Sequence, residues 1–469
     1  MTRPPVPTLL RRAPAVLVGI AAILLCVSAG VSAATNGFDA ATLLRIGLVL
    51  GGLLVVVWMG RFEFFLLAVL VVRPVLDIAK VGGGPAVLSS GVAALVVLGV
   101  LLWLAAQLHG GTLRRVSVLG QLSVLLLAVM TVSAVFSGDQ VRSLLQVARL
   151  AAAVAVFLAV EQFAVAERNR RRVLTAVYVS AVVPLLVGLQ QFATGTYLKQ
   201  SSGLGRVTGT FLHPNAFGFY LVLLLIMGTA IFRYLQGGPR LLVGAVVAVG
   251  SVELLLTYSR GSWATVVAGV LVVGVLQSRK LLLLVPAGLA LVVVLAPSVL
   301  TRLSDLSQEE TINGTPGNSF LWRVQHWGVV LEGAQGHEFL GLGPSASDYL
   351  GAEVLPPHND FVRMYVETGV LGTTVYLAVI VAALAMALRA LRAVPDGRIG
   401  RGVAVGAAGC TAAFVLGSFG GNLISEVVVL LYLFTFFALA TSLTLHPPQP
   451  ALRPPRHAPA HAMTAGSPR

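Results

Sequence analysis

Three short polar clusters interrupt a sequence of 469 residues that is otherwise mostly apolar. The first cluster, GRVTGTFLHPNAFGFY, contains Arg206 and Asn215. The second, LLLTYSRGSWA, contains Arg260, and the third, LPPHNDFVRMYVETGVLG, contains His358 and Asn359. Each cluster borders an apolar segment long enough to enter a membrane. We therefore treat these residues as candidate functional groups, because charge at such a boundary is costly unless it serves a purpose.

These residue types suit the transfer of a group that is carried on phosphate. Arginine offers a permanent charge and a planar fork of donors that matches phosphate oxygens. Helix N-termini expected at residues 212 and 361 add free amide groups for an anion. A histidine titrates near neutrality and can take a proton from a hydroxyl. Simpler roles stay open, since an arginine can anchor to lipid phosphate and an asparagine can merely cap a helix.

A polar stretch of the chain, residues 301–360, precedes and includes part of the third cluster. It contains Arg323 within FLWRVQHW, and its aromatic residues predict short amphipathic helices that lie on the membrane. Long loops in compact proteins are usually functional or disordered. His326, His337 and Glu338 of this loop lack a ligand spacing such as HExxH, so we predict neither a metal site nor a cofactor.

The composition shows what must position these clusters. Apolar residues make up 57% of the chain and charged residues only 11%, which excludes a soluble enzyme, because soluble domains carry roughly 25% charged residues. A bilayer core needs about 20 apolar residues per helix. The sequence therefore predicts an all-α, polytopic membrane helix bundle with about 14 transmembrane helices, or 12 or 13 if interrupted segments such as 62–79 do not cross. The candidate spans are 13–33, 41–60, 62–79, 84–107, 116–136, 142–164, 171–192, 212–232, 241–258, 262–278, 281–300, 361–388, 402–419 and 424–445.

The basic residues predict the orientation of this bundle. Lys and Arg are enriched in the cytoplasmic loops of membrane proteins, and most of them fall on one side when both termini are cytoplasmic. The formal charge of +14 is then a topology signal and does not indicate a nucleic-acid partner. All three polar clusters fall on the opposite, outer side.

The sequence predicts that the chain has two parts. Residues 1–445 are expected to form a single transmembrane bundle with one large extracytoplasmic loop, 301–360. Residues 446–469 are rich in Pro, Ala and Arg and are expected to form a disordered cytoplasmic tail.

Four local sequences, in order, resemble those of the bacterial O-antigen ligase and O-antigen polymerase superfamily. GRVTGTFLHPNAFGFY is similar to its R-x-x-G-T-F-x-x-P-N element, and LTYSRGSW to its T-x-S-R-G/S element. WRVQHW followed by FLGLGPSASDY resembles its R-x-x-x-W … G-x-G loop. PPHNDFVRMYVETGVLG resembles its P/A-H-N … E-x-G-x-x-G element. The resemblance covers about residues 200–385.

This resemblance implies a GT-C-like, metal-independent glycosyltransferase of the bacterial cytoplasmic membrane, in contact with membrane lipids. Such enzymes move a glycan, with inversion, from a polyprenyl-diphosphate carrier to a glycan, lipid-linked or protein hydroxyl on the outer side. By the same resemblance Arg206 and Arg260 would bind the donor diphosphate, and His358 would be the base or position the acceptor. Arg323, Asn215 and Asn359 would bind donor or acceptor.

Two further hypotheses depend on the residues alone. A multi-pass transporter or exporter of a small solute or lipid is the alternative function. Transporters usually show internal repeats and polar sites at the membrane midplane, whereas polar residues here gather at the boundary. At the midplane, Arg149 and Glu253 are each other's only evident partner at similar depth, so we expect that they either form an ion pair or each face a water-filled cavity.

Overall fold

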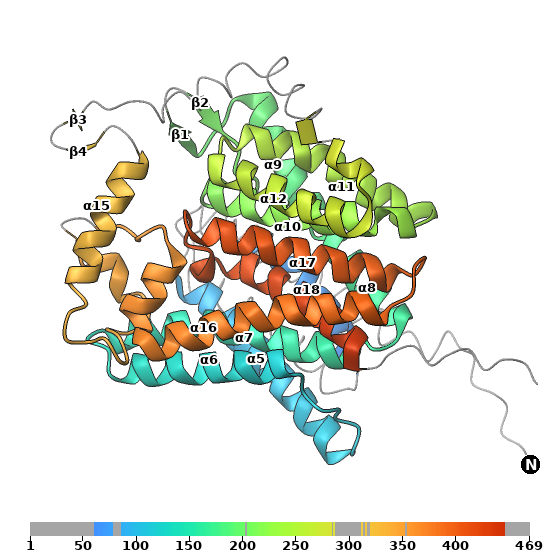
Figure 1. The fold of residues 1–469 in the computed structure, drawn as a ribbon, viewed down its shortest axis with the longest axis horizontal. Helices are drawn as coiled ribbons and strands as arrows, with labels where there is room; N and C mark the ends of the chain where they lie inside the picture. The colour runs from blue at the N-terminus through green and yellow to red at the C-terminus, as the bar shows by residue number, and fades with distance from the viewer. Residues whose placement is uncertain are drawn as a thin grey trace, which may run out of the picture.

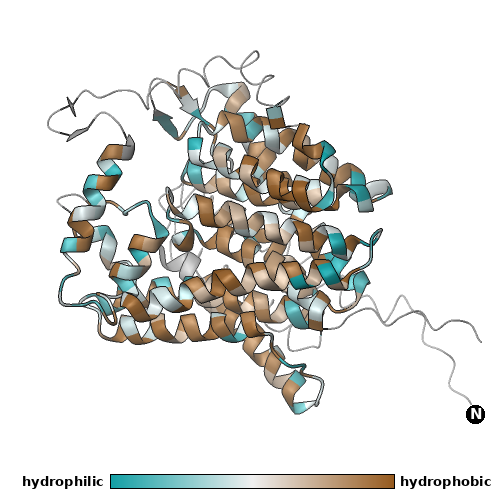
Figure 2. Ribbon diagram, viewed as in Figure 1, coloured by the Kyte–Doolittle hydropathy of each residue, from teal (hydrophilic) through white to brown (hydrophobic). Residues whose placement is uncertain are grey.

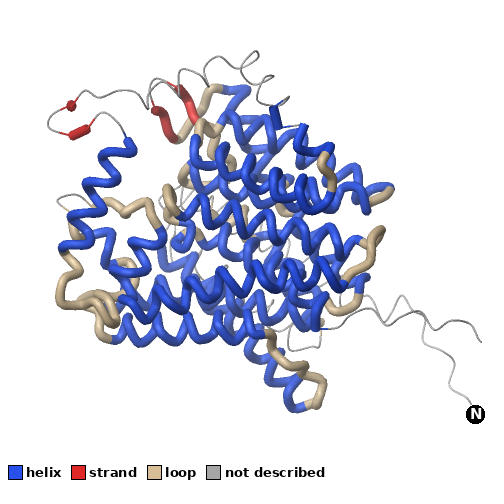
Figure 3. Tube along the Cα trace, in the orientation of Figure 1, coloured by secondary structure: helices blue, strands red, loops and turns tan. Residues whose placement is uncertain are grey.

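The computed structural model describes residues 61–77, 86–201, 204–283, 319–351 and 354–445, with the short segments 285–286, 311–312 and 315–316. These parts are almost entirely helical (Figures 1 and 3). The helices are α3 Phe62–Val72, α5 Ala86–His109, α6 Val118–Val135, α7 Gln140–Phe163, α8 Glu167–Val179, α9 Val182–Thr194, α10 Pro214–Ile231, α11 Gly237–Leu256, α12 Arg260–Gln277, α15 Ser319–Glu332, α16 Asp360–Ala393, α17 Ile399–Ser418 and α18 Val427–Leu445. The strands are β1 Lys199–Ser201, β2 Leu204–Arg206, β3 Thr311–Ile312 and β4 Thr315–Pro316, and the 3-10 turns are η1 Phe232–Tyr234, η3 Ala346–Tyr349 and η4 Leu423–Ser425.

Ten helical spans in the described residues are long and apolar enough to cross a membrane, and each coincides with a predicted segment. One span comprises α8 and α9 together. The predicted segment 62–79 contains the short helix α3, which ends where Arg73 pairs with Asp77 at 2.9 Å. Segments 13–33 and 41–60, most of 281–300 and the tail 446–469 lie outside the described residues. The polytopic helical bundle is confirmed, while the total of 14 crossings and the GT-C-like fold stay predictions.

The bundle has a buried centre and a lipid-compatible exterior. Helices α10, α17 and α18 are buried along most of their length. Apolar side chains of α5 and α6, such as Leu101 and Val132, are exposed. Figure 2 shows that the helix surfaces are largely hydrophobic, whereas polar residues gather at the helix ends and on α15. At the centre, small residues let helices approach closely, as membrane bundles require: a Cβ at Gly409 of α17 would lie 2.9 Å from the carbonyl of Gly269 in α12.

Helix α16 is broken in its third turn, at Gly369, where the loop before it packs against it. Gly369 has φ 63° and ψ −165°, which are not helical. The N–H groups of Leu342 and Gly343 donate to the carbonyls of Val366 and Glu367 at 2.9 and 3.0 Å, and the Glu338 carbonyl accepts from Val370 N–H at 2.7 Å. The loop thus satisfies backbone groups that the break would leave unpaired. This contact gives a structural role to the glycines in FLGLG and VETGVLG.

Gly369→Ala is expected to destabilise the protein by about 2–4 kcal/mol, because this backbone conformation is open essentially only to glycine. A Cβ at this position would also lie 2.3 Å from the Phe339 carbonyl oxygen. Thermal unfolding in detergent measures the effect. Gly238→Ala in α11 is the matched control, because a Cβ there meets nothing within 4 Å. A Gly369→Ala protein as stable as this control would contradict the proposed strain.

Candidate functional site

Arg206 ends strand β2 and reaches the turn between α11 and α12. Its Nε donates to the Thr257 carbonyl at 2.7 Å, and its Nη2 donates to Asn215 Oδ1 at 2.9 Å. The neighbouring backbone is fixed as well, since the Val207 N–H donates to the Leu256 carbonyl at 3.0 Å. Arg206 is only 8% exposed. The first two polar clusters are therefore joined through one guanidinium.

Arg260 is the first residue of α12, directly after that turn. Tyr258 in the turn has a positive φ of 48°, an unusual conformation for a bulky residue that occurs where surrounding contacts enforce it. Ser259 contributes such a contact, with its hydroxyl 2.8 Å from that of Ser262. The Thr257 carbonyl that holds Arg206 lies only three residues before Arg260. The turn thus positions both arginines.

Helix α15 packs against the third cluster and against the connection between α17 and α18. Arg323 Nη1 donates to the Gly420 carbonyl at 3.0 Å. One turn further, Trp327 Nε1 donates to the Pro357 carbonyl at 2.6 Å, and His326 Nε2 lies 3.1 Å from the Leu355 carbonyl. The loop that was expected to carry amphipathic helices therefore folds α15 onto the segment that contains His358.

His358 has a positive φ of 52° and is held by Asn422, in the short connection between α17 and α18. The His358 N–H donates to Asn422 Oδ1 at 2.9 Å, and Asn422 Nδ2 lies 2.9 Å from His358 Nδ1. Burial, and then the nearby positive charge of Arg323, lower the pKa of His358 to about 3. The imidazole is therefore neutral at physiological pH.

Asn359 and Asp360 organise the start of α16. Asn359 Oδ1 accepts from the N–H groups of Phe361 and Val362 at 2.9 and 3.2 Å, which is a helix cap. The fully buried carboxylate of Asp360 accepts from the N–H groups at 423 and 424, both at 3.2 Å, and from the Ser418 hydroxyl at 2.8 Å. Asp360 thereby fixes the connection that carries Asn422. A binding role for Asn359 stays a prediction.

The sequence did not single out Asn422 as functional. It lies in GGNLIS, four residues into a connection between two apolar segments, where a lone asparagine is typical of an ordinary turn. Only the packing of this turn against the start of α16 reveals its contact with His358.

The candidate residues gather at one end of the bundle, which we call the loop end because α15 and the β1–β2 hairpin lie there (Figure 1). Electrostatic interactions connect each of these residues to the next one in space. Besides burial, the charge of Arg206 lowers the pKa of His213, and the charge of Arg323 lowers the pKa of His358. His213 also lies close enough to His358 to influence its pKa. The pKa of Arg323 is itself lowered by burial and by the charge of Arg260. The structure thus brings together Arg206, Arg260, Arg323 and His358, with His213 of the first cluster beside them.

The side chains that meet at the loop end are rich in hydrogen-bond donors and positive charge. This combination suits an anion with several oxygens, such as a diphosphate. Within the described residues, no three His, Cys, Asp or Glu side chains are grouped to hold a metal ion.

The predicted Arg149–Glu253 pair is wrong. Both residues are described, yet Arg149 Nη1 donates to Gln146 Oε1 at 3.0 Å. The carboxylate that interacts most strongly with Arg149 is that of Glu426. Glu253 is buried against Gly188 of α9. Equal depth did not make them neighbours, because α7 packs on α5, α6 and α18, whereas α11 packs on α9 and α10.

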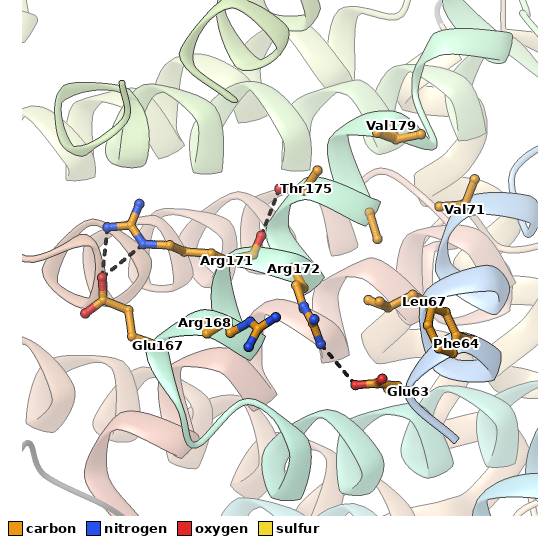
Figure 4. Close-up of a pocket in the computed structure, with 11 residues that line it drawn as sticks. Glu63, Phe64, Leu67, Val71, Glu167, Arg168, Arg171, Arg172, Thr175 and Val179 are labelled. Atoms are coloured by element: carbon orange, nitrogen blue, oxygen red, sulfur yellow. Dashed lines mark hydrogen bonds and ion pairs between the residues drawn. The ribbon is translucent and has the colours of Figure 1, made fainter. Parts of the chain in front are cut away.

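A cavity of about 800 Å³ lies between α3 and α8, away from the loop end (Figure 4). Helix α7 starts at the loop end, where Ser143 donates to the Pro344 carbonyl at 2.8 Å, and α8 begins just after its far end. Two arginines of the cavity are neutralised locally, Arg171 by Glu167 at 2.8 Å and Arg172 by Glu63 at 3.0 Å. Its chemistry therefore differs from that of the loop end.

Comparison with known families assigns one segment of the chain. Residues 245–377 match the family model described as O-antigen ligase. This segment is an O-antigen ligase domain. It runs from within α11 into α16 and contains Arg260, Arg323 and His358, while Arg206 and Asn215 precede it. No curated protein matches the chain. The domain and the helix bundle indicate a membrane protein with an O-antigen ligase-like function.

The low pKa of His358 predicts how this O-antigen ligase-like protein responds to acid. Since the pKa falls from 6.5 to about 3 on folding, the unfolded chain binds more protons between these values. Stability from neutral His358 is therefore present above pH 6.5 and is lost as the pH falls toward 3. Initial transfer rates measured from about pH 5 to 8 should show no acid limb that belongs to His358. A limb near pH 6.5 that disappears in His358→Gln would contradict this expectation.

Proposed function

We propose that this protein is a bacterial cytoplasmic-membrane glycosyltransferase that moves a glycan from a polyprenyl-diphosphate carrier to a hydroxyl acceptor. The observation that carries the proposal is the meeting of Arg206, Arg260 and Arg323 at the loop end, beside His358, within or next to the O-antigen ligase domain. Surface arginines that merely anchor to lipid need not converge on one another or be fixed by backbone carbonyls.

The arginines are assigned to the donor. Transfer breaks the bond between the sugar's anomeric carbon and the diphosphate oxygen, and the electron pair leaves with the diphosphate. Arg206 and Arg260 stabilise this developing negative charge, with Arg323 and Asn215 as further donor or acceptor contacts. Because guanidinium groups supply the positive charge, we propose that the reaction proceeds without metal.

The acceptor is assigned to the opposite face of the sugar. Its hydroxyl oxygen forms the new bond to the anomeric carbon from the side away from the diphosphate, so the configuration inverts. His358 lies beside Arg323, on the side of the sugar where the arginines are, and is the proposed catalytic residue. The acceptor is a glycan, a lipid-linked sugar or a protein hydroxyl. The asymmetry of basic residues supports a loop end that faces outward, with both termini in the cytoplasm.

The test uses the purified protein in lipid nanodiscs with a polyprenyl-diphosphate-linked glycan and a hydroxyl acceptor. The proposal predicts that free polyprenyl diphosphate and glycosylated acceptor form in equal amounts, and that a chelator does not stop the reaction. Nanodiscs have no second compartment, so a transporter or exporter would release neither product. An intact donor after incubation, together with solute flux in proteoliposomes, would favour the transporter.

A further inference from the structure

The hydrogen bonds between His358 and Asn422 fix which ring nitrogen carries the proton. A backbone N–H can only donate, so the atom of Asn422 that faces the His358 N–H must be its Oδ1. The amide nitrogen of Asn422 then faces Nδ1 at 2.9 Å. That amide nitrogen also only donates, so Nδ1 must accept and cannot hold a proton. The single proton of the neutral imidazole therefore lies on Nε2.

The surrounding contacts hold His358 and Asn422 in this hydrogen-bonded arrangement. Asp360 holds the connection that carries Asn422 through the N–H groups of Leu423 and Ile424. The positive φ of His358 turns both its N–H and its ring toward the same amide. Rotation of the Asn422 amide would place two donors against each other at the His358 N–H and two acceptors against each other at the unprotonated Nδ1. The tautomer is thus a property of the folded backbone at this position.

The groups around His358 favour a neutral ring. The positive charges of Arg323 in α15 and Arg363 in α16 face it, and the imidazoles of His326 and His213 lie near it. A proton on His358 would add a further positive charge beside the two arginines. His213 repeats the pattern, because its Nδ1 accepts from the N–H of Asn215 at 3.1 Å, which leaves its proton on Nε2 when the ring is neutral.

We propose, as a deepening of the glycosyl transfer proposed above, that His358 uses its Nε2–H as a hydrogen-bond donor to the leaving diphosphate, and that Asn422 is the positioning residue that maintains this tautomer. A general base would need a lone pair on Nε2. That lone pair exists in the neutral ring only if Nδ1 is protonated, which would set an N–H against the amide of Asn422.

The reaction balances without a histidine base. The acceptor oxygen forms its bond to the anomeric carbon as the bond from that carbon to the diphosphate oxygen breaks. The electron pair goes to the diphosphate, whose charge is met by Arg206, Arg260 and the Nε2–H of His358. The acceptor's proton passes to solvent water on its own side of the sugar, so His358 begins and ends neutral.

The first test compares His358→Gln with His358→Ala. Glutamine can donate through its amide but cannot take a proton at neutral pH, so it separates the donor from the base. We expect His358→Gln to retain at least about a tenth of the wild-type turnover and His358→Ala to lose about 10²-fold. His337→Gln, at an exposed position of the same loop, is the control and should match wild type. Equal loss of about 10²–10⁴-fold in both His358 variants would indicate a base and overturn the inference.

The second test reverses the tautomer with Asn422→Asp. A carboxylate accepts from both the backbone N–H and a protonated Nδ1, which leaves the lone pair on Nε2. We expect this variant to be at least about 10-fold slower than wild type at pH 8, and to recover as the pH falls, because the imidazolium carries protons on both nitrogens. A base would give the opposite result, with full or higher rates at pH 8 that decline in acid. The change of rate with pH within one variant does not depend on its folded yield.

These outcomes separate the inference from the function it rests on. If wild-type protein releases no carrier from a polyprenyl-diphosphate-linked glycan, the proposed glycosyl transfer fails. If wild type is active while His358→Gln is inactive and Asn422→Asp is active at pH 8, the transfer stands and the donor role of His358 is wrong.

Discussion

Arg260→Ala is expected to lower the rate of glycan transfer at low donor concentration by about 10²–10³-fold, the loss seen when one preorganised donor to a developing anion is removed. Arg260 begins α12, immediately after the turn whose Thr257 carbonyl holds Arg206 at 2.7 Å. Arg260→Ala therefore removes one of the two guanidinium groups proposed to bind the diphosphate. It leaves in place Thr257, whose carbonyl holds Arg206. Initial rates of carrier release measure the effect.

Two further variants show whether geometry or charge alone is required. Arg260→Lys should recover only part of the activity, because an ammonium group cannot make the two parallel contacts of a guanidinium. Arg240→Ala in α11 is the control, since Arg240 is exposed and lies against the Phe232 ring instead of the loop end. Full activity of Arg260→Ala would mean that Arg260 does not bind the donor and serves only as an anchor to lipid phosphate.

Arg363→Ala is expected to destabilise the protein by about 3–5 kcal/mol, because it leaves the buried carboxylate of Glu367 without its partner. Arg363 is 1% exposed, binds Glu367 at 3.0 Å and also pairs with Asp348. Ser347 joins the same network by donating to Glu367 at 2.5 Å. These contacts tie η3 and the loop before it to α16. Thermal unfolding in detergent, measured without substrate, reports the loss.

Arg171→Ala provides the comparison for an exposed ion pair. Arg171 and Glu167 lie at 2.8 Å, but their side chains are 47% and 46% exposed, so their pair should contribute less than about 1 kcal/mol. Similar losses in Arg363→Ala and Arg171→Ala would mean that the buried network does not hold the loop in place.

Local hydropathy was enough to find the spans of the bundle. A continuous apolar segment can satisfy its backbone in lipid only as a helix, so segments such as 142–164 and 402–419 could be located without knowledge of their neighbours. The interruption at Arg73 and Pro74 also marked the shorter helix α3. Which helices pack together could not be derived in this way, and the error over Arg149 and Glu253 follows from that.

The candidate site was predictable where a motif carried it. Arg206, Arg260, Arg323 and His358 come from recognisable local sequences, and the structure places them at one end. Asn422 and the cap role of Asn359 depend on contacts between segments far apart in the chain. The role of His358 as a donor could not be derived from the sequence either, because the tautomer of its ring depends on the amide of Asn422, 64 residues away.

Photo-cross-linking with a polyprenyl diphosphate that carries a photoreactive group on its first isoprene unit tests most directly whether the loop end binds the donor. Mass spectrometry of the labelled protein locates the attachment. We expect label on peptides that contain Arg206, Arg260, Arg323 or His358, and loss of that label in Arg260→Ala. Label confined to the α3–α8 cavity beside Arg171 and Arg172, unchanged in Arg260→Ala, would contradict this expectation.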